Sequence, residues 1–300
     1  MKYNLAPVII FCYKRLDLLK KLLRSLEKNQ NSKKITVFFF LDNFKNEKDK
    51  NDVIEVRSFI EKYKFFNNKK IILRKKNYGL KKNISNGIKY VFRKYNKIIV
   101  LEDDLEVSKN FLTVMNILLN KYENVKNIST ITGYSFSNNK FRKLKIKENF
   151  FLLKRPSSWG WATWKNKWQK IQKVDLSLEP SFKDYGNDLT LMSIKKKKNL
   201  LNSWAFDWTL KHIKTKQFCM YPKFTMVKNN GFDGYATNNF FKTKKFLTKI
   251  KFIKIKNYSY KQENNYIKNL SKLNYDSNIF LFLFKFIFFK LFYAKTRKNK

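Results

Sequence analysis

Hydrophobic residues form two alternating patterns over about the first 135 residues of this chain. Short, continuous apolar runs predict strands that are buried on both faces. Between these runs, apolar residues recur at intervals of three and four, which predicts amphipathic helices. The expected strands are residues 7–13, 35–41, 70–74, 97–101 and 128–133, and the expected helices are residues 15–28, 53–63, 80–95 and 110–122. Strands that alternate with helices predict an α/β fold with a mostly parallel sheet and helices on both faces.

The second half of the chain has a less regular pattern. Residues 150–153, 218–221 and 225–227 predict short strands, residues 187–197 and 203–214 predict helices, and residues 157–164 (SSWGWATW) and 229–234 predict loops. We expect this half to complete a cleft over the edge of the sheet, and not to form an independent domain. The predicted organisation is therefore one domain over residues 1–245, with halves at 1–135 and 136–245, followed by a tail over residues 246–300.

The tail is basic and rich in phenylalanine. Its apolar run, residues 279–294, is interrupted by Lys285 and Lys290. A helix of this length extends about 24 Å, which is short of the roughly 30 Å hydrocarbon core of a bilayer. The pattern therefore favours a helix that lies in the interface of an anionic membrane surface, with its lysines reaching the headgroups. The alternative is a terminal helix packed on the protein.

The charge of the chain is strongly positive, with 66 basic and 22 acidic residues and a net charge of +44. Such a balance is typical of nucleic-acid-binding proteins. Here, however, the lysines are spread along the whole chain, and Lys, Asn, Ile, Phe and Tyr are abundant together, as in proteins from AT-rich genomes. We therefore expect no specific nucleic-acid partner, but attraction to anionic lipids and phosphorylated substrates. The two cysteines, Cys12 and Cys219, support neither a disulfide framework nor a zinc site.

Acidic side chains gather where the expected strand 97–101 ends, at Glu102, Asp103 and Asp104. Carboxylates are not left unpaired in an apolar interior, so this cluster is either solvated or faces a cation. Ligands of open α/β sheets bind at this edge. A hard divalent ion held there could bridge to the oxygens of a diphosphate. The alternative is an ordinary acidic loop or helix N-terminus.

Three other charged residues strengthen the prediction of a site. Arg15 and Asp42 also lie just after expected strands, so they map to the same sheet edge as the acidic cluster. A nucleotide-diphosphate site needs such a set, with a base pocket, a ribose acceptor and a metal. Asp207 lies between aromatic residues, which are poor surroundings for a solvated charge, although a helix surface charge is the alternative.

The stretch 100–111, VLEDDLEVSKNF, resembles the metal-binding segment of GT-A fold glycosyltransferases. The similarity is closest to the animal N-acetylglucosaminyltransferase I family and its bacterial relatives in surface polysaccharide assembly. Residues 41–49, 77–80, 157–164 and 204–208 also resemble those bacterial enzymes, so that the resemblance covers roughly residues 7–234. It implies a GT-A fold and a metal-dependent, inverting transfer of a sugar from a nucleotide-diphosphate donor.

The resemblance also implies roles for individual residues. Asp104 would coordinate Mn²⁺ or Mg²⁺, Glu102 and Asp103 would face the donor sugar and ribose, Asp42 would contact the nucleobase or ribose, Arg15 would lie near the nucleotide, and Asp207 would be the general base. Further donor-binding candidates are Asn77, Gly79, Trp159 and Gly160. For these four the alternatives are an ordinary loop before a helix and a place in the aromatic core.

The acceptor implied by the resemblance is a glycan or glycolipid of the lipopolysaccharide or capsule type. The animal enzymes carry an N-terminal anchor and a luminal stem, which have no counterpart before the first expected strand. We therefore expect a cytoplasmic bacterial enzyme, held at the inner face of the membrane by its tail. A nucleotidyltransferase is an alternative, but residues 11–15 lack the glycines of a phosphate loop. A non-enzymatic basic binding protein would explain the charge but not the converging carboxylates.

Overall fold

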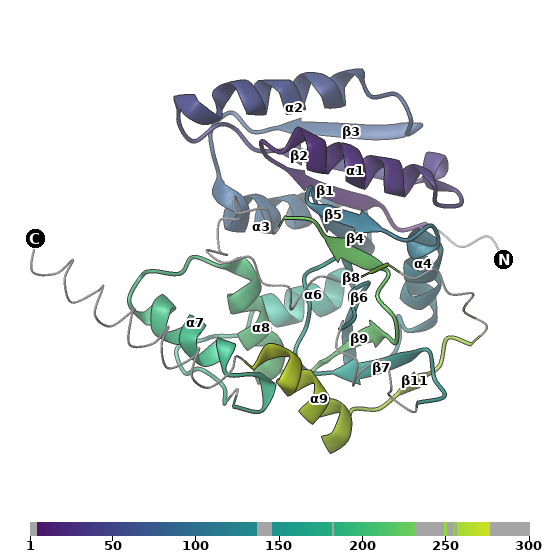
Figure 1. The fold of residues 1–300 in the computed structure, drawn as a ribbon, viewed down its shortest axis with the longest axis vertical. Coiled ribbons are helices and arrows are strands. Elements are labelled where there is room, and N and C mark those ends of the chain that lie inside the picture. The colour runs from purple at the N-terminus through teal and green to yellow at the C-terminus, as the bar shows by residue number, and fades with distance from the viewer. Residues whose placement is uncertain are drawn as a thin grey trace, which may run out of the picture.

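The computed structural model describes residues 5–136, 146–181, 183–231, 249–250, 255 and 257–276. Its centre is a nine-stranded sheet of order β11-β7-β9-β6-β8-β4-β1-β2-β3 (Figure 1). The strands are β1 Val8–Cys12, β2 Thr36–Leu41, β3 Asn68–Leu73, β4 Lys97–Glu102, β6 Ile128–Thr132, β7 Phe150–Leu153, β8 Trp161–Trp164, β9 Phe218–Pro222 and β11 Tyr260–Lys261. A separate two-stranded sheet pairs β5, Leu105–Val107, with β10, Val227–Asn229.

The direction of the strands divides the large sheet. Strands β3, β2, β1 and β4 are parallel neighbours, as are β6 and β9, and β7 and β11. Strand β8 lies between β4 and β6 and is antiparallel to both, and β7 is antiparallel to β9. The expected α/β fold with a mostly parallel sheet is therefore confirmed.

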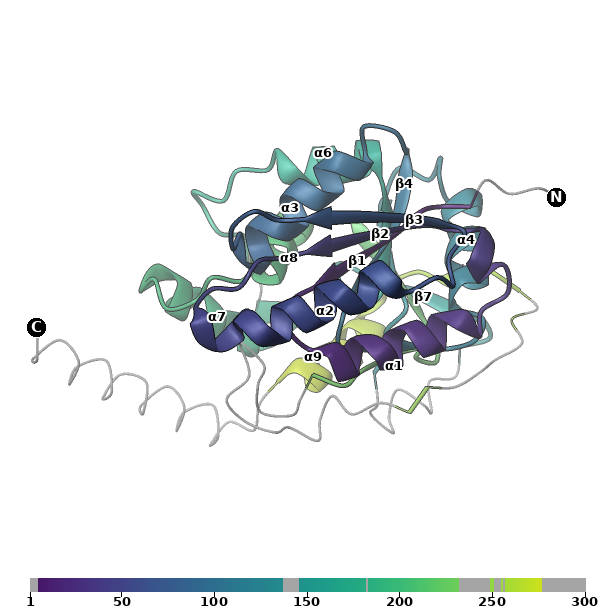
Figure 2. The ribbon, with the colours of Figure 1, turned by 90° about the horizontal axis from the view of Figure 1, so that it is seen from above.

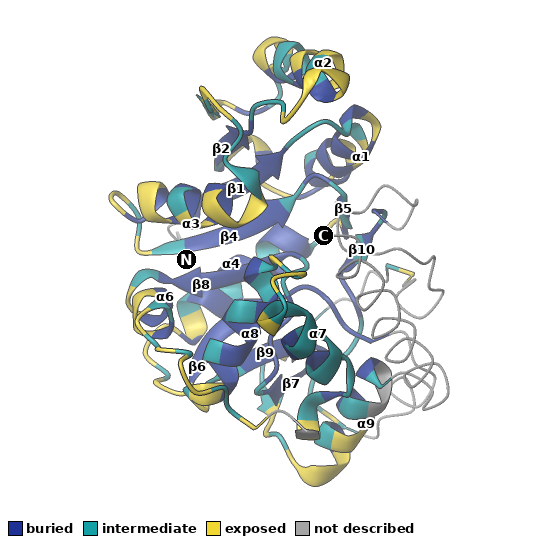
Figure 3. Cartoon of the chain, turned by 90° about the vertical axis from the view of Figure 1, so that its left-hand side faces the viewer, coloured by how far each residue is buried: buried dark blue, intermediate teal, exposed yellow. Residues whose placement is uncertain are grey.

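Helices cover both faces of the sheet (Figure 2). They are α1 Leu16–Glu27, α2 Lys50–Lys62, α3 Gly79–Val91, α4 Phe111–Lys121, α6 Lys165–Gln172, α7 Asp188–Lys197, α8 Trp204–Lys214 and α9 Asn265–Tyr275, with short 3₁₀ turns at Ser32–Lys34, Glu47–Asp49 and Lys183–Tyr185. Alternate residues of β1 explain the two layers. Ile10 packs in a core with α1, α2 and α4, whereas Ile9 packs in a second core with α3, α6 and α8. Since both faces are covered, the whole strand is buried (Figure 3).

Most of the expected elements agree with the structure to within a few residues, but three differ. The helix expected over residues 80–95 ends at Val91, and the chain then forms a turn in which Tyr95 N–H still bonds to the Val91 carbonyl. The strand expected over residues 225–227 begins at Val227 instead. The loop expected over residues 157–164 is wrong in its last four residues, which form the buried strand β8. The run WATW becomes a strand because it fills the gap between β4 and β6.

Part of the segment assigned to the tail belongs to the folded body. Strand β11 pairs with β7, and α9 buries Ile267 and Leu270 against the aromatic core beside β7 and β9. Within the segment 246–300 that was assigned to the tail, β11 and α9 thus pack on the sheet. The apolar run of the tail, residues 279–294, lies outside the described residues. Among the described helices, none is long and apolar enough to cross a membrane.

Candidate functional site

The acidic run stands at the end of β4, next to the end of β1. Asp103 N–H donates to the Phe11 carbonyl, which continues the pairing of the two strands by one residue. The Asp103 carboxylate is buried and uses both oxygens. Oδ2 accepts from Tyr13 N–H at 3.1 Å, and Oδ1 accepts from Arg15 Nη2 at 2.8 Å. Asp103 thus ties the loop after β1 to the end of β4.

Arg15, just before α1, is shared between two carboxylates. Its Nη2 also donates to Asp104 Oδ2 at 3.1 Å. One guanidinium therefore faces a cluster of three acidic groups. Burial, followed by the charges of Asp104 and Asp103, raises the pKa of Glu102 to about 8. Burial is also the largest cause that raises the pKa of Asp104, to about 6. The cluster has more negative charge than Arg15 compensates, so it is suited to a further cation.

The small sheet of β5 and β10 covers this cluster. Asn229 pairs with Leu105, which places the following residues over Asp104. Asn230 N–H donates to the Asp104 carbonyl at 2.8 Å, and Gly231 N–H donates to Asn229 Oδ1 at 2.7 Å. A Cβ on Gly231 would collide with Asp104 Oδ2. The glycine therefore allows the backbone to lie directly against the metal-ligand candidate. The remainder of the loop, residues 232–234, lies outside the described part of the chain.

Asp42 organises the neighbouring part of the edge, at the end of β2. Its Oδ1 accepts from Asn43 N–H at 2.9 Å and from Tyr78 N–H at 2.8 Å. Asn77 Nδ2 donates to the Asn43 carbonyl at 2.5 Å. Gly79 then begins α3 with a φ of +69°, and a Cβ there would meet no atom within 4 Å. The sequence-predicted set Asp42, Asn77 and Gly79 is therefore one connected loop structure.

Trp159 and Gly160 reach the same edge through β8. Because Trp161 pairs with Val100, the residues before Trp161 lie where β4 ends. The half-buried ring of Trp159 packs edge-on against Tyr134, with ring centroids 4.7 Å apart. Gly160 has a φ of +59°, and a Cβ there would lie 2.7 Å from Val227 Cγ2. Close packing alone thus requires glycine at position 160, whether or not it contacts a ligand.

Asp207 lies in the first turn of α8, outside the acidic cluster. It receives a hydrogen bond of 2.6 Å from Lys81 to Oδ2 and another of 2.6 Å from Lys196 to Oδ1. Burial alone would raise the pKa of Asp207, but the hydrogen bonds from Lys196 and Lys81 outweigh it and hold the pKa below its ordinary value. Since Lys81 follows Gly79 in α3, this helix connects Asp207 to the loop around Asp42.

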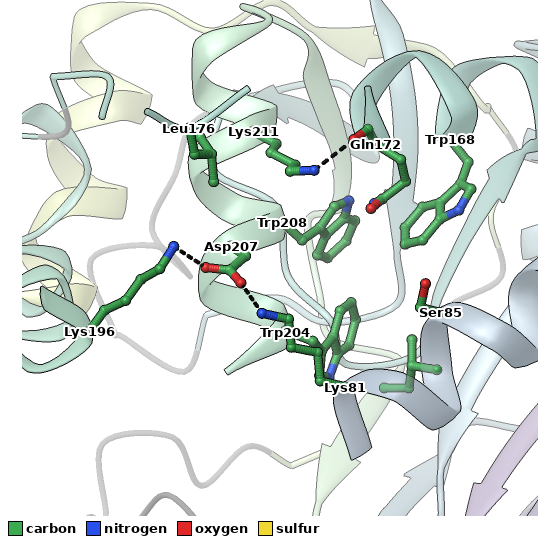
Figure 4. Close-up of a pocket in the computed structure, with 11 residues that line it drawn as sticks. Lys81, Ser85, Trp168, Gln172, Leu176, Lys196, Trp204, Asp207, Trp208 and Lys211 are labelled. Carbon is green, nitrogen blue, oxygen red and sulfur yellow. Dashed lines mark hydrogen bonds and ion pairs between the residues drawn. The ribbon is translucent and has the colours of Figure 1, made fainter. Parts of the chain in front are cut away.

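A pocket of about 220 Å³ surrounds Asp207 (Figure 4). Its described lining is aromatic and basic, and comprises Lys81, Ile84, Ser85, Trp168, Gln172, Leu176, Lys196, Trp204, Asp207, Trp208 and Lys211. The pocket lies on the side of the sheet that is covered by α3, α6 and α8. The expectation of an aromatic setting for Asp207 is thus correct, although the lysines were not foreseen. In a chain with 66 Lys and Arg residues, no pattern distinguishes these three.

The single histidine is structural. His212 is fully buried, with Ser129 Oγ 2.8 Å from Nε2 and the Lys154 carbonyl 2.9 Å from Nδ1. Burial lowers the pKa of His212 to about 4. The ring is therefore neutral, which fits Nδ1 as donor to the carbonyl and Nε2 as acceptor from the hydroxyl.

The class of protein that this fold defines is the GT-A glycosyltransferases, in which a parallel sheet carries an acidic site at its edge. The chain belongs to the family described as glycosyl transferase family 2, whose model matches residues 8–200. It is therefore an enzyme, a glycosyltransferase. This membership favours the glycosyltransferase over the nucleotidyltransferase and the non-enzymatic binding protein that the sequence alone had left open.

One solved structure supports the fold. The chain is similar to GalNAc-T7, crystallised with UDP, GalNAc and Mn²⁺, at 12% identity and a TM-score of 0.50, covering 75% of this chain and 44% of that one. It is also similar to the mannosyltransferase PcManGT from Pyrobaculum calidifontis with GDP-Man and Mn²⁺ (9% identity, TM-score 0.39, covering 60% and 51%) and to S. aureus TarS (15% identity, TM-score 0.32, covering 42% and 21%). The chain thus spans about half or less of these proteins. No curated protein matches it.

Proposed function

We propose that this glycosyltransferase transfers a sugar from a nucleotide-diphosphate donor to a hydroxyl of a bacterial surface glycan, with inversion at the transferred carbon. The single observation that carries the donor site is the convergence of Arg15, Asp103 and Asp104 at the sheet edge next to Asp42. The acceptor class and the inverting outcome rest on the resemblance to the N-acetylglucosaminyltransferase I family and its bacterial relatives.

The proposed metal is Mn²⁺ or Mg²⁺, held by Asp104 with Glu102 beside it. The raised pKa values of both carboxyls support this, because a divalent cation would stabilise their charged forms. In the described part of the chain, no three His, Cys, Asp or Glu side chains converge as a metal cage. We propose that the ion takes Asp104 as its protein ligand and completes its shell with phosphate oxygens and water. Such an ion would stabilise the charge on the leaving diphosphate.

The remaining donor contacts follow from the hydrogen bonds. Asp103 has both oxygens engaged, so we propose that it positions Arg15 and the loop after β1, near the ribose. Arg15 would offer its guanidinium to the nucleotide. Asp42, Asn77 and Gly79 would contact the nucleobase or ribose of the donor. Trp159 and Gly160 would line the part of the site that holds the donor sugar.

Asp207 is the proposed general base. It would accept the proton of the acceptor hydroxyl as that oxygen attacks the donor sugar on the face opposite the diphosphate. In the present structure each oxygen of this carboxylate accepts a hydrogen bond from one lysine, Lys81 or Lys196, which makes Asp207 a weaker base. An acceptor that draws one lysine away would raise the basicity of the carboxylate.

A comparison of two variants tests this division of roles. We expect Asp104→Ala to abolish the Mn²⁺-dependent thermal shift produced by a nucleotide sugar, since it removes the metal ligand. Asp207→Ala should keep that shift and lose turnover by about 100-fold or more, as expected for a general base. A donor at about 100 times its Kd adds about 2.7 kcal/mol to the stability, which a thermal-shift assay detects. Equal loss of donor binding in both variants would contradict the assignment.

We also propose that the enzyme acts at the cytoplasmic face of the membrane through residues 279–294. A chain that ends at Asn278 should remain in the supernatant when the full chain sediments with vesicles of anionic lipid. We expect this because residues 279–294 are apolar apart from two lysines, which suits binding in the membrane interface. If the shortened chain sediments as fully as the full chain, the attraction to the vesicles comes from the positive charge of the whole protein and not from residues 279–294.

A further inference from the structure

The pocket around Asp207 combines one carboxylate with three ammonium groups (Figure 4). Among its described lining residues, Asp207 is acidic, and Lys81, Lys196 and Lys211 are basic. Three positive charges against one negative charge leave an excess of +2. The excess lies in a concave space between α3, α6, α7 and α8, where Lys196 and Lys211 are half-buried and Lys81 is exposed at the rim.

The contacts of the lysines show that Asp207 compensates only part of this positive charge. Lys81 and Lys196 share the carboxylate of Asp207, one on each oxygen. Lys211 Nζ instead donates to the Gln172 carbonyl at 2.7 Å. Burial is the largest cause that holds the pKa of Lys211 below its ordinary value, and the charges of Lys81 and Lys196 add to it, against the opposing charges of Asp207 and Asp175. The repulsion among these cations therefore destabilises the empty pocket, and a bound anion would reduce this repulsion.

The other walls of the pocket are aromatic. Trp168, Trp204 and Trp208 line it, and Trp204 and Trp208 are stacked with ring centroids 5.5 Å apart. Trp161 of β8 supports them from the sheet, 4.7 Å from Trp208. Apolar rings with a few converging polar groups are the usual lining of a small-molecule site. The volume is below the roughly 300–1,000 Å³ of drug-sized sites, which suits a single sugar ring.

We propose that this pocket binds the acceptor sugar, and that this sugar carries an anionic group, either a carboxylate or a phosphate. The inference rests on the proposed function, in which Asp207 is the general base for the acceptor hydroxyl. The sugar ring lies against the tryptophans, its hydroxyl faces Asp207, and its anionic group is held by the lysines. A neutral sugar would leave the positive excess of the pocket uncompensated.

The tryptophans provide the measurement. The full chain is titrated, and its fluorescence recorded, with pairs of sugars that differ in charge: methyl β-glucuronide against methyl β-glucoside, methyl β-galacturonide against methyl β-galactoside, and glucose 6-phosphate against glucose. At least one anionic sugar should bind about ten-fold or more tightly than its neutral partner, as expected for a charge-assisted contact. The uronide and phosphate pairs identify which anion the pocket prefers.

Two lysine variants show whether the preference arises in the pocket. Lys211→Met should reduce it to about three-fold or less, because it removes one of the two excess charges and keeps the stem of the side chain. Lys170→Met is the matched control, since Lys170 is exposed on α6 and the change in net charge is the same. This control should keep the full preference. Lys81→Met provides a second pocket variant if Lys211→Met does not fold.

Three results would overturn the proposal. These are equal binding within every pair of sugars, a preference that survives both pocket variants, and a preference that Lys170→Met also removes. Inorganic phosphate that binds as tightly as glucose 6-phosphate would contradict the role of the tryptophans. The donor thermal shift is measured on the same preparation. A donor shift without a charge preference defeats this inference alone, whereas a charge preference without any donor response defeats the proposed transferase chemistry alone.

Discussion

At the scale of single residues, His212 provides a stability switch that is independent of the reaction. Its folded pKa of about 4 lies below the ordinary value of 6.5, so folding favours the neutral ring. This stabilisation is complete above the unfolded pKa and is lost as the pH falls toward the folded pKa. Between about pH 7.5 and about pH 5, we expect His212 to account for about 2 kcal/mol of lost unfolding free energy.

Urea unfolding of His212→Gln tests this expectation. The variant should be less stable than the parent at neutral pH but should lose less stability on acidification, because its side chain does not titrate. Ser129→Ala is the control, since it removes the hydroxyl that contacts Nε2 and keeps the imidazole. It should lower the stability and keep the steep pH dependence. A parallel pH dependence of His212→Gln and the parent would exclude His212 as the cause.

For the candidate site residues, the sequence predicted their places at strand ends better than their contacts. Glu102, Asp103 and Asp104 were placed correctly because the end of a buried strand is visible in the hydrophobic pattern. The pairing of Asp103 with Arg15, and of Asp207 with two lysines, was not predicted. The pairing of β1 with β4 brings Arg15 to Asp103, and the packing of α3, α7 and α8 brings Lys81 and Lys196 to Asp207. The hydrophobic pattern of the sequence shows neither of these arrangements.

At the scale of elements, β8 depends on a tight corner at Gly160. Alanine at this position must adopt a left-handed backbone and place its Cβ against Val227, so we expect Gly160→Ala to destabilise the fold by about 2–4 kcal/mol. Gly79→Ala has a similar φ but open space around the Cβ, and should cost only about 1–2 kcal/mol. Chemical unfolding of both variants separates backbone strain from collision.

A double-mutant cycle completes this test. Val227→Ala removes the methyl group that the new Cβ meets, so the Gly160→Ala/Val227→Ala variant should be more stable than the sum of the single changes predicts, by about 1 kcal/mol or more. Additive effects, or equal costs for the two glycine variants, would show that the corner at Gly160 has room for a side chain.

The same strand shows the limit of prediction at this scale. The strands of the first half are long apolar runs, whereas β8 is four residues that follow a glycine and contain two tryptophans. Its strand character comes from pairing with β4 on one side and β6 on the other, which is information from distant parts of the chain. The short strands β5 and β11 and the helices α6 and α9 were not predicted either.

At the scale of the whole molecule, the net charge of +44 should make stability depend on salt. Self-repulsion destabilises a compact state, and it is screened as the Debye length falls from about 30 Å at 0.01 M to about 8 Å at 0.15 M. Exposed ion pairs are worth only about 0–1 kcal/mol each, so their weakening by salt is the smaller effect. We expect the Tm to rise by at least about 2 °C over this range.

Differential scanning calorimetry in sodium chloride checks the sign. A control series in sucrose, which stabilises by exclusion from the surface and carries no charge, separates screening from a general solvent effect. A Tm that falls with sodium chloride would mean that the ion pairs dominate over the net repulsion.

The division of the chain is also a property of the whole molecule. Strand β6, from the first half, has as its neighbours β8 and β9 from the second half. The proposed halves at 1–135 and 136–245 therefore contribute strands to one sheet, and their strands alternate where β8 lies between β6 and β4. A hydrophobic pattern gives the order of strands along the chain but not their order in the sheet, so this interleaving was not predicted.

The pairing of Asp207 with two lysines has a consequence for the idle enzyme. A transferase that holds an activated sugar is always exposed to water, which can take the place of the acceptor and waste the donor. While each carboxylate oxygen accepts from an ammonium group, Asp207 is a weaker base toward a water molecule in the pocket. An incoming anion that competes for those ammonium groups would remove this restraint on arrival. Binding of the acceptor would then itself free Asp207 from the lysines. Until the acceptor binds, the enzyme would lose less donor to hydrolysis.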